Sequence, residues 1–427
     1  MFGLKLKAGA LQLTLFIIVV IALLLMTFIL LIHTHKQFRI QSDFIVETTK
    51  TSNLGINYTL NNDLSLEDTI SISLKDENYK SLKVYRDFWG AFERVTSISQ
   101  VKNNRFQKTA LIGSSQKNDN RSVLYVQDND RPLVLVGNTK IEGLAYLPKQ
   151  GVKSGTISGQ SYNGSQLIYG IQSVSNKLPK LDNEMLVSLK KIQGIHHENN
   201  QGQFLNLKDG EQYNNSFLKP LQIIFSNDVL NLTNVQLTGH ILIQSRSKIV
   251  VHYSSKLTDV VLVAPEIEIQ NNVNGRFQAI ASKKIIVENN VELNYPSALI
   301  LNEREESNQS RLSNSQFQQV NGIVIGDNTT IKGQVVYLGQ ENPNNYKVQI
   351  EIKEQATLFG ELYCNQNTEL KGTVYGTVYA NNFLVNKFGS IYQNHLYDTT
   401  ININELPQEY VGLSFLDSKK EILKWLY

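Results

Sequence analysis

The stretch that decides the fold runs from Ile241 to Leu301 and reads ILIQSRSKIVVHYSSKLTDVVLVAPEIEIQNNVNGRFQAIASKKIIVENNVELNYPSALIL. Similar apolar runs begin within it at Ile241, Val261, Ala279 and Ala298, so the intervals are 20, 18 and 19 residues. Self-similarity at a fixed period is typical of repeat folds, in which each turn of the chain is one unit. An interval of this length fits a three-sided coil of short strands.

A second strand follows three of these runs and alternates strictly between polar and apolar residues. The three segments are Lys248–His252, Glu266–Gln270 and Lys284–Glu288. A period of two places successive side chains on opposite faces of a strand. We therefore expect inward stacks of aliphatic residues (Ile249, Val251, Ile267, Ile269, Ile285, Val287) and an outward column of Lys248, Glu266 and Lys284.

An antiparallel β-sandwich is the main alternative, because short strands bounded by turn residues also describe that class. A sandwich does not require its strands to recur at one interval, whereas a coil does. The coil also places Asn271-Asn272 and Asn289-Asn290 at equivalent corners, where asparagine tolerates a left-handed backbone. We predict a mainly β fold with a three-sided parallel β-helix.

The N-terminal part contains a membrane span at residues 8–32, AGALQLTLFIIVVIALLLMTFILLI, in which no residue is charged. A helix of this length exceeds the roughly 30 Å hydrocarbon core of a bilayer. A signal peptide has a shorter apolar region and a small-residue cleavage site, and the flank from Ile32 to Lys36 does not fit that pattern. We predict a tail of residues 1–7, a single uncleaved transmembrane helix and the lipid bilayer as a partner.

The orientation of this helix is not decided by the flanking charges, since Lys5 and Lys7 precede it and Lys36 and Arg39 follow it. The large C-terminal part is rich in Asn, Gln and Ser, a composition that favours the extracytoplasmic side. We expect a single-pass protein of the bacterial inner membrane with its C-terminal domain in the periplasm.

The rest of the chain divides by changes in pattern. No Pro or Gly follows the transmembrane helix until Gly55, so we expect the helix to continue beyond the membrane.

Ser418-Lys-Lys-Glu421 is a capping box, so we expect a short capping helix there, or an amphipathic helix that docks a partner through Trp425 and Tyr427. The expected parts are a juxtamembrane helix (33–60), a small β-rich region (61–130), the first β-helix rungs (131–180), an inserted helix and loop (181–220), the main β-helix (221–402) and a C-terminal capping segment (403–427).

The segment from Ala356 to Tyr397, ATLFGELYCNQNTELKGTVYGTVYANNFLVNKFGSIYQNHLY, resembles the bactofilins, bacterial polymer-forming β-helix proteins with recurring Gly-x-aliphatic steps. In this segment Gly376-Thr-Val-Tyr379 follows Gly360-Glu-Leu-Tyr363 by 16 residues, which we interpret as one turn of the coil. The resemblance implies filaments lying against a membrane. Bactofilins are compact domains with short tails, however, whereas a membrane span and a long β-rich region come first here.

The segment from Lys7 to Phe16, KAGALQLTLF, resembles the start of a minor pilin or pseudopilin. The resemblance implies peptidase processing after Gly9, so that the mature chain begins at Ala10. Most pilins place a Glu five residues into the mature chain, and Thr14 stands there in this sequence.

Composition and motifs give little indication of chemistry. The net charge is only +3, so we expect no nucleic-acid partner. The single cysteine, Cys364, excludes an intramolecular disulfide. His33-x-His35 and His196-His197-Glu198 lack the spacing of known zinc sites, so we predict no metal and no cofactor.

The outward face of the expected β-helix is a candidate polysaccharide-processing surface. Such catalysis requires two carboxylates within about 5 to 9 Å of each other. Glu266, Glu268 and Glu288 do not converge in the expected register, so we predict no catalytic residues and no enzymatic activity.

A short acceptor pattern for O-glycosylation of exported bacterial proteins occurs twice, as Asp68-Thr69-Ile70 and as Asp398-Thr399-Thr400, with Thr69 and Thr399 as the candidate sites.

These observations predict a non-enzymatic, membrane-anchored structural or assembly protein of the bacterial cell envelope, acting with other envelope proteins. Two alternatives remain open: a minor-pilin-like component of a secretion or pilus apparatus, and an exported carbohydrate-active enzyme.

Overall fold

The computed structural model describes residues 8–74, 79–116, 121–194, 203–304, 321–340, 342, 345–416 and 418–426. The chain forms two compact units. Unit 1 comprises residues 1–59, 69–85 and 97–108, and unit 2 comprises residues 60–68, 86–96 and 109–427. The fold is mainly β, with one long N-terminal helix.

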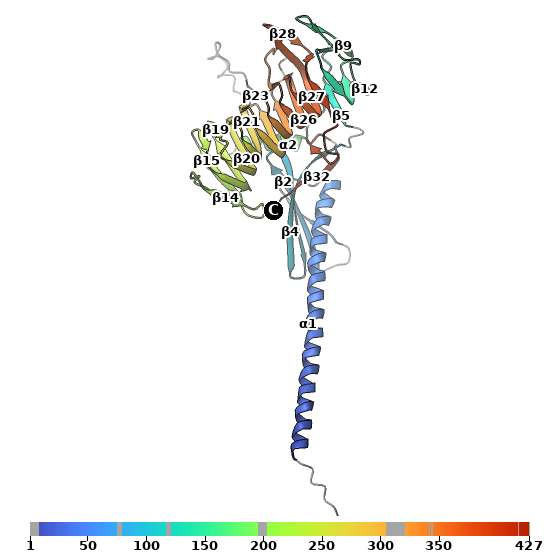
Figure 1. Cartoon of the computed structure of the whole chain (residues 1–427), viewed down its shortest axis with the longest axis vertical. Helices are drawn as coiled ribbons and strands as arrows, with labels where there is room; N and C mark the ends of the chain where they lie inside the picture. Colours follow the sequence, from blue (N-terminus) through green and yellow to red (C-terminus); the bar gives the residue numbers. More distant parts are fainter. Residues whose placement is uncertain are drawn as a thin grey trace, which may run out of the picture. The chain divides into compact units, whose positions relative to one another are not determined.

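Unit 1 is built on α1 (Ala8–Asn61), which is a single uninterrupted helix of 54 residues (Figure 1). Its last turns pack on strand residues of the same unit. Ser99 Oγ donates a hydrogen bond to the Thr48 carbonyl oxygen at 2.7 Å, and Ser52 Oγ donates to that of Ser97 at 3.4 Å. At Gly55 an added Cβ would lie 2.2 Å from Ser97 Oγ, so this close approach requires glycine.

An antiparallel sheet has the order β1-β2-β3-β4-β31, and β32 also pairs with β4. The division between the units passes through β2, β3 and β4. The strands are β1 (Thr69–Ile72), β2 (Lys80–Trp89), β3 (Phe92–Val101), β4 (Asn104–Ser115), β31 (Val411–Gly412) and β32 (Lys420–Leu426).

The expected C-terminal helix is wrong, because Lys420–Leu426 is strand β32. Its backbone pairs in antiparallel register with β4, for example Ile422 with Ile112 and Leu426 with Thr109. A single short helix is marginal by itself, whereas pairing with an existing strand satisfies the same backbone groups. Tertiary pairing therefore overrides the capping-box signal of Ser418 to Glu421.

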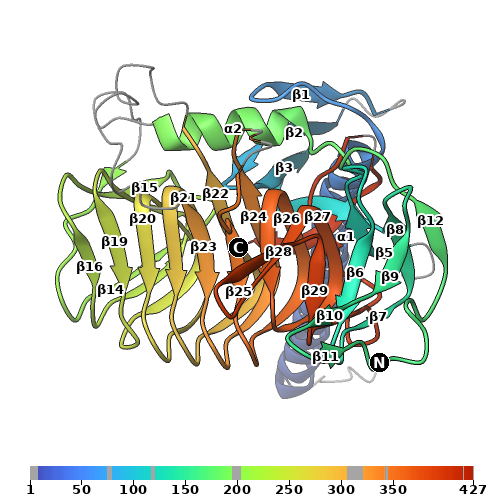
Figure 2. The same cartoon turned by 90° about the horizontal axis from the view of Figure 1, so that it is seen from above.

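The core of unit 2 is a closed sheet of mainly parallel strands, which we call the closed parallel sheet (Figure 2). Its strands are β5 (Ser122–Val126), β7 (Lys140–Glu142), β8 (Leu144–Leu147), β12 (Gln172–Val174), β13 (Gln203–Phe204), β14 (Gln212–Asn215), β15 (Gln222–Ser226), β16 (Leu230–Leu232), β17 (Gln236–Gly239), β18 (Ile241–Ser245), β19 (Lys248–Val251), β20 (Lys256–Ile269), β21 (Asn274–Val287), β22 (Glu292–Asn302), β23 (Gly322–Ile325), β24 (Thr330–Leu338), β25 (Ile350–Ile352), β26 (Thr357–Leu370), β27 (Thr373–Lys387), β28 (Ser390–Gln393) and β30 (Thr400–Asn402).

Smaller elements accompany this sheet. A three-stranded sheet has the order β29-β6-β9, and β10 pairs with β11 in a hairpin. A helix, α2, lies in the segment where an inserted helix and loop were expected. These elements are β6 (Leu133–Val136), β9 (Val152–Ser154), β10 (Thr156–Ile157), β11 (Gln160–Ser161), β29 (His395–Tyr397) and α2 (Asn183–Gly194).

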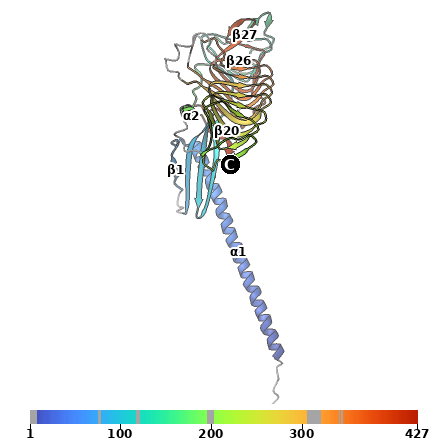
Figure 3. The ribbon, with the colours of Figure 1, turned by 90° about the vertical axis from the view of Figure 1, so that its left-hand side faces the viewer.

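Successive turns of the chain stack in parallel. Strands β14, β15 and β16 pair with β17, β18 and β19, and these three pair with successive segments of β20. The same stacking continues from β20 through β21, β22, β24 and β26 to β27 (Figure 3). The chain thus returns to the same place at each interval, as a repeat requires.

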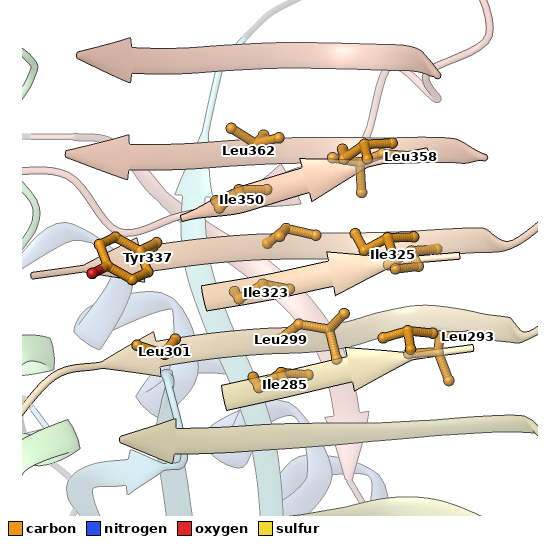
Figure 4. Packing of buried hydrophobic residues seen from close by; sticks show 14 of the residues in the cluster. Ile285, Leu293, Leu299, Leu301, Ile323, Ile325, Tyr337, Ile350, Leu358 and Leu362 are labelled. Atoms are coloured by element: carbon orange, nitrogen blue, oxygen red, sulfur yellow. The ribbon is translucent and has the colours of Figure 1, made fainter. Parts of the chain in front are cut away.

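The register of the alternating strands is confirmed. Lys248 pairs with Glu266, and Glu266 pairs with Lys284. The inward aliphatic residues stack as expected, and Figure 4 shows Ile285, Ile323 and Ile350 continuing one such column. All three side chains are fully buried.

The register of the apolar runs differs by one residue from the equal-interval alignment. Leu242, not Ile241, pairs with Val261, and Ala279 pairs with Leu299, not with Ala298. The reason is that these runs are buried on both faces, so alternation does not mark which residue points inward. Outward residues such as Leu242 and Val261 pack in a second apolar cluster with Trp89 and with α2.

The predicted order of the turns needs a correction. Residues of the 131–180 segment do not precede the 221–402 segment in the stack, because β7 pairs with β30 through Ile141 and Ile401. Strand β5, which precedes the 131–180 segment in the chain, pairs with β27 through Leu124 and Val378. The early strands therefore extend the late end of the stack, and they cover the strand edge that we expected the C-terminal segment to cap.

The asparagine corners are confirmed. Asn272 and Asn290 have positive φ angles of 63° and 58°, in the left-handed region. The side-chain oxygen of Asn271 accepts a hydrogen bond from the backbone N–H of Asn289 at 2.9 Å, and Asn289 repeats this contact with Asp327 at the same distance. The side chains thus bind one turn to the next.

Replacing the inward Ile285 by alanine should destabilise unit 2 by about 2–5 kcal/mol, because a fully buried aliphatic side chain is lost from the stack. The adjacent Ile286 points outward and is half-buried, so Ile286→Ala is the matched control and should cost less. The measurement is the unfolding midpoint of the full chain in detergent micelles, followed by circular dichroism. Equal losses for the two variants would contradict the assigned register.

Candidate functional site

The first candidate surface is the apolar part of α1. Its large side chains are exposed from Leu11 at 75% to Ile32 at 56%, and it is long and apolar enough to cross a membrane. Gly9 and Ala10 lie exposed at its start, and no atom outside the local helix lies within 4 Å of a Cβ added at Gly9. The expected processing site thus lies in the first turn of the apolar helix.

The later part of α1 is held in unit 1 by polar contacts. Lys80 forms an ion pair with Glu47, and Lys108 Nζ donates a hydrogen bond to Asn53 Oδ1 at 2.8 Å. Lys102 lies over the ring of Phe44, with its Nζ 4.4 Å from the ring centroid. The apolar part of α1 thus continues, within one helix, into a part that is bound to the strands of unit 1.

A buried charged cluster lies in unit 2. Arg121 donates a hydrogen bond to Glu361 Oε1 at 3.0 Å, and both side chains are buried. Arg121 also donates to the Tyr410 carbonyl oxygen at 3.0 Å, while Glu361 Oε2 accepts the backbone N–H of Leu413 at 2.6 Å. Burial raises the pKa of Glu361, although Arg121 opposes that change. These contacts join Arg121, just before β5, to β26 and to the segment from Tyr410 to Leu413.

His240 is a second buried titratable group. Its ring packs on Trp89 and Phe217, with centroid separations of 4.9 and 5.2 Å. Burial, together with the nearby positive charge of Arg94, lowers the pKa of His240 to about 4. Arg94 lies 2.8 Å from Nε2, and the Lys219 carbonyl oxygen lies 3.0 Å from Nδ1. A neutral ring that donates from Nδ1 satisfies both contacts.

The residues expected to dock a partner are not on an exposed helix. Trp425 lies half-buried on β32, where it pairs with Ala110 of β4. The neighbouring Lys424 binds Asp259 at 2.5 Å, which further holds this strand in unit 2. Tyr427 lies outside the described residues.

The two candidate glycosylation sites differ. Thr69 lies exposed on β1, the edge strand of the antiparallel sheet. Thr399 is wrong as a candidate, because only 1% of it is exposed and its hydroxyl donates a hydrogen bond to the Gly372 carbonyl oxygen at 2.6 Å. A corner hydroxyl that is buried in this way is closed to a glycosyltransferase.

The described residues contain no group of three or more His, Cys, Asp or Glu side chains suited to a metal. His33 and His35 lie along α1, and His196, His197 and Glu198 lie outside the described residues. Cys364 is fully buried, and burial raises the pKa of its thiol to about 12. It packs among the inner aliphatic residues.

One pair of carboxylates was missed by the sequence reasoning. Glu351 of β25 and Glu369 of β26 are direct register partners, so they lie on adjacent strands. Both line an outward hollow of about 430 Å³. The signal was present in the alternating segments Ile350-Glu-Ile352 and Thr368-Glu-Leu370, which repeat at an interval of 18 residues. Glu266, Glu268 and Glu288 do not line this hollow.

Comparisons with known proteins give little. No family model and no curated protein matches the sequence. Among solved structures, the chain is similar to the competence-associated pilin ComZ from Thermus thermophilus, with 8% identity and a TM-score of 0.25 over 90% of this chain and 97% of that one. A likeness at this score supports no statement about fold or function.

Removing either partner of the Arg121–Glu361 pair should destabilise the full chain in detergent micelles by about 3–5 kcal/mol, because the other charge is left buried and unpaired. The double variant Arg121→Ala/Glu361→Ala should cost much less than the sum of the single variants. Thermal unfolding of all three variants measures this coupling.

The exposed pair Lys419–Glu421 is the matched control, with its side chains 71% and 40% exposed. The same cycle there should give a coupling below about 1 kcal/mol. Additive losses at Arg121 and Glu361 would contradict the assigned role of the buried pair.

Proposed function

We propose that the chain is a membrane-anchored assembly protein of the bacterial cell envelope, with a three-sided parallel β-helix as its extracytoplasmic domain. The observation that carries the proposal is α1, in which an exposed apolar segment continues without a break into a segment packed on strand residues. A continuous helix fixes unit 1 to its anchor, whereas a flexible linker would allow that unit to move freely.

The β-helix part of the proposal is supported by the strand pairing. Three strands in one turn pair with three strands in the next, and the aliphatic columns continue across several turns. Such a stack is stabilised by contacts between adjacent turns. It therefore suits a structural role in which the outer surface binds other envelope components.

A minor-pilin-like subunit is the second candidate. The favouring observation is α1 itself, in which Gly9 and Ala10 lie exposed in the first turn, an apolar segment follows, and the last turns pack on strand residues. Membrane insertion alone does not require this helix to be continuous with a folded unit. Both candidates account for the continuity of α1, and processing after Gly9 distinguishes them.

The periplasmic location of the large domain is tested with a site-specific protease. The exposed turn at Gly159 between β10 and β11 has no atom within 4 Å of an added Cβ, so it is suited to a recognition sequence. We expect cleavage in cells whose outer membrane alone is permeabilised, while a cytoplasmic marker protein stays intact. A scrambled insert is the control, and cleavage only after the inner membrane is breached would reverse the topology.

The pilin-like candidate is tested by the mass of the N-terminus. It predicts that the chain isolated from cells begins at Ala10, and that Gly9→Val blocks this processing and leaves residues 1–9 in place. Gly3→Val is the matched control and should be processed normally. An intact N-terminus in the natural chain would eliminate the pilin-like candidate and leave the membrane-anchored assembly protein.

A further inference from the structure

The hollow beside Glu351 and Glu369 has features of a binding site. Its volume of about 430 Å³ lies within the roughly 300–1,000 Å³ range of small-ligand sites. Gly322 pairs with Lys284 at an outward position and lines the hollow, where the Gln349 carbonyl oxygen lies 2.8 Å from the place a Cβ would occupy. The half-exposed Val324 adds an apolar side chain to the lining.

The polar lining of the hollow is fixed in place by contacts within unit 2. Lys371 Nζ lies 3.3 Å from Glu351 Oε1 and 3.3 Å from Glu369 Oε2, so it bridges the two carboxylates. Glu369 Oε1 also accepts the backbone N–H of Asn386 at 2.9 Å. Glu369 is only 4% exposed, which is unusual for a carboxylate on an outward position.

The charges around the hollow nearly cancel. Glu351 and Glu369 are offset by the bridging Lys371, while Lys284 and Lys347 add separate ammonium groups. Nucleotides and other polyanions need a concentrated positive field or a cradle of backbone N–H groups, and this lining has neither arrangement. A lipid tail would remove water from the charged side chains of Lys284, Lys347 and Glu351 without offering them a hydrogen bond, which is costly.

An exposed aromatic ring adds a different kind of contact. Tyr346 is 51% exposed and lines the hollow beside Lys347. An aromatic ring offers a flat apolar face, while carboxylates, amides and ammonium groups offer hydrogen-bond acceptors and donors. A sugar ring has both an apolar C–H face and a rim of hydroxyl groups, so it matches this combination.

We propose that the hollow binds a short stretch of a neutral glycan chain, with Tyr346 against the face of one sugar and the polar groups at its rim. The site binds the glycan without cleaving it, since a glycosidase needs one carboxyl held protonated as the acid and the other free to act. Burial lowers the pKa of Lys371, but Glu369 and Glu351 outweigh burial and raise it overall, so the bridging ammonium keeps its charge. This proposal does not depend on the anchor function.

The test is direct binding of soluble oligosaccharides to the purified full chain in detergent micelles. Isothermal titration calorimetry would use tetramers of N-acetylglucosamine and, separately, tetramers of glucose. We expect saturable binding of at least one of them, and Tyr346→Ala should weaken it by about tenfold, or about 1.4 kcal/mol, because the flat apolar face against the sugar is lost.

Tyr253→Ala is the matched control, because Tyr253 is 62% exposed and does not line the hollow. That variant should bind the glycan like the natural chain. Glu351→Gln should also weaken binding, and Tyr346→Ala and Glu351→Gln should keep the natural circular dichroism spectrum.

Three outcomes would overturn the proposal. The first is that neither tetramer binds, and the second is that Tyr346→Ala and Tyr253→Ala bind equally well. The third is shortening of either tetramer during incubation, measured by chromatography and abolished in Glu351→Gln, which would show that the site cleaves its ligand. None of these outcomes depends on the location of the domain or on processing after Gly9, because the soluble glycans are added directly to the purified chain.

Discussion

The pairing of β5 with β27 is the contact on which the closed parallel sheet depends. Leu124 pairs with Val378 and Tyr125 with Tyr379, so residues far apart in the sequence become adjacent. Without this pairing, the backbone groups of β27 from Val378 to Ala380 would lose their partners in β5, which is the usual hazard of a strand edge. The stack can therefore be complete only after both ends of the chain have been made, and such non-local pairing slows folding.

The buried charges lie beside this closure and help to specify it. Arg121 immediately precedes β5, while Glu361 lies on β26 next to Thr377 of β27. Thr377 in turn donates a hydrogen bond to the Ser122 carbonyl oxygen at 2.6 Å. A buried ion pair is a weak source of stability but strongly disfavours arrangements that separate its members. A slip of β5 along β27 would separate Arg121 from Glu361, so the pair favours one register.

Sequence patterns predicted the parts of this fold that alternate. Lys248, Glu266 and Lys284 were placed correctly because one face of their strands is polar. The apolar runs were displaced by one residue because both of their faces are buried.

Long-range pairing left no comparable signal in the sequence. Nothing local to Ile141 indicates that it stacks on Ile401, and nothing local to β32 shows that β4 has a free edge. The Glu351–Glu369 pair did have a signal, an interval of 18 residues, but its significance depends on a hollow formed by several turns.

The outer surface of the closed parallel sheet follows from the same difference between strands. Outward apolar residues such as Leu242 and Val261 are covered by α2 and Trp89. Where outward residues are polar, the face stays open, and substitutions there leave the inner aliphatic stack intact. A binding site can therefore form on the open polar face without disturbing the core.

Glu369 is an exception among the outward polar residues, since it is nearly buried and needs Lys371 to offset its charge. A solvated surface does not require such a bridge, whereas a preorganised binding site gains from it, because its polar groups are then fixed before the ligand arrives.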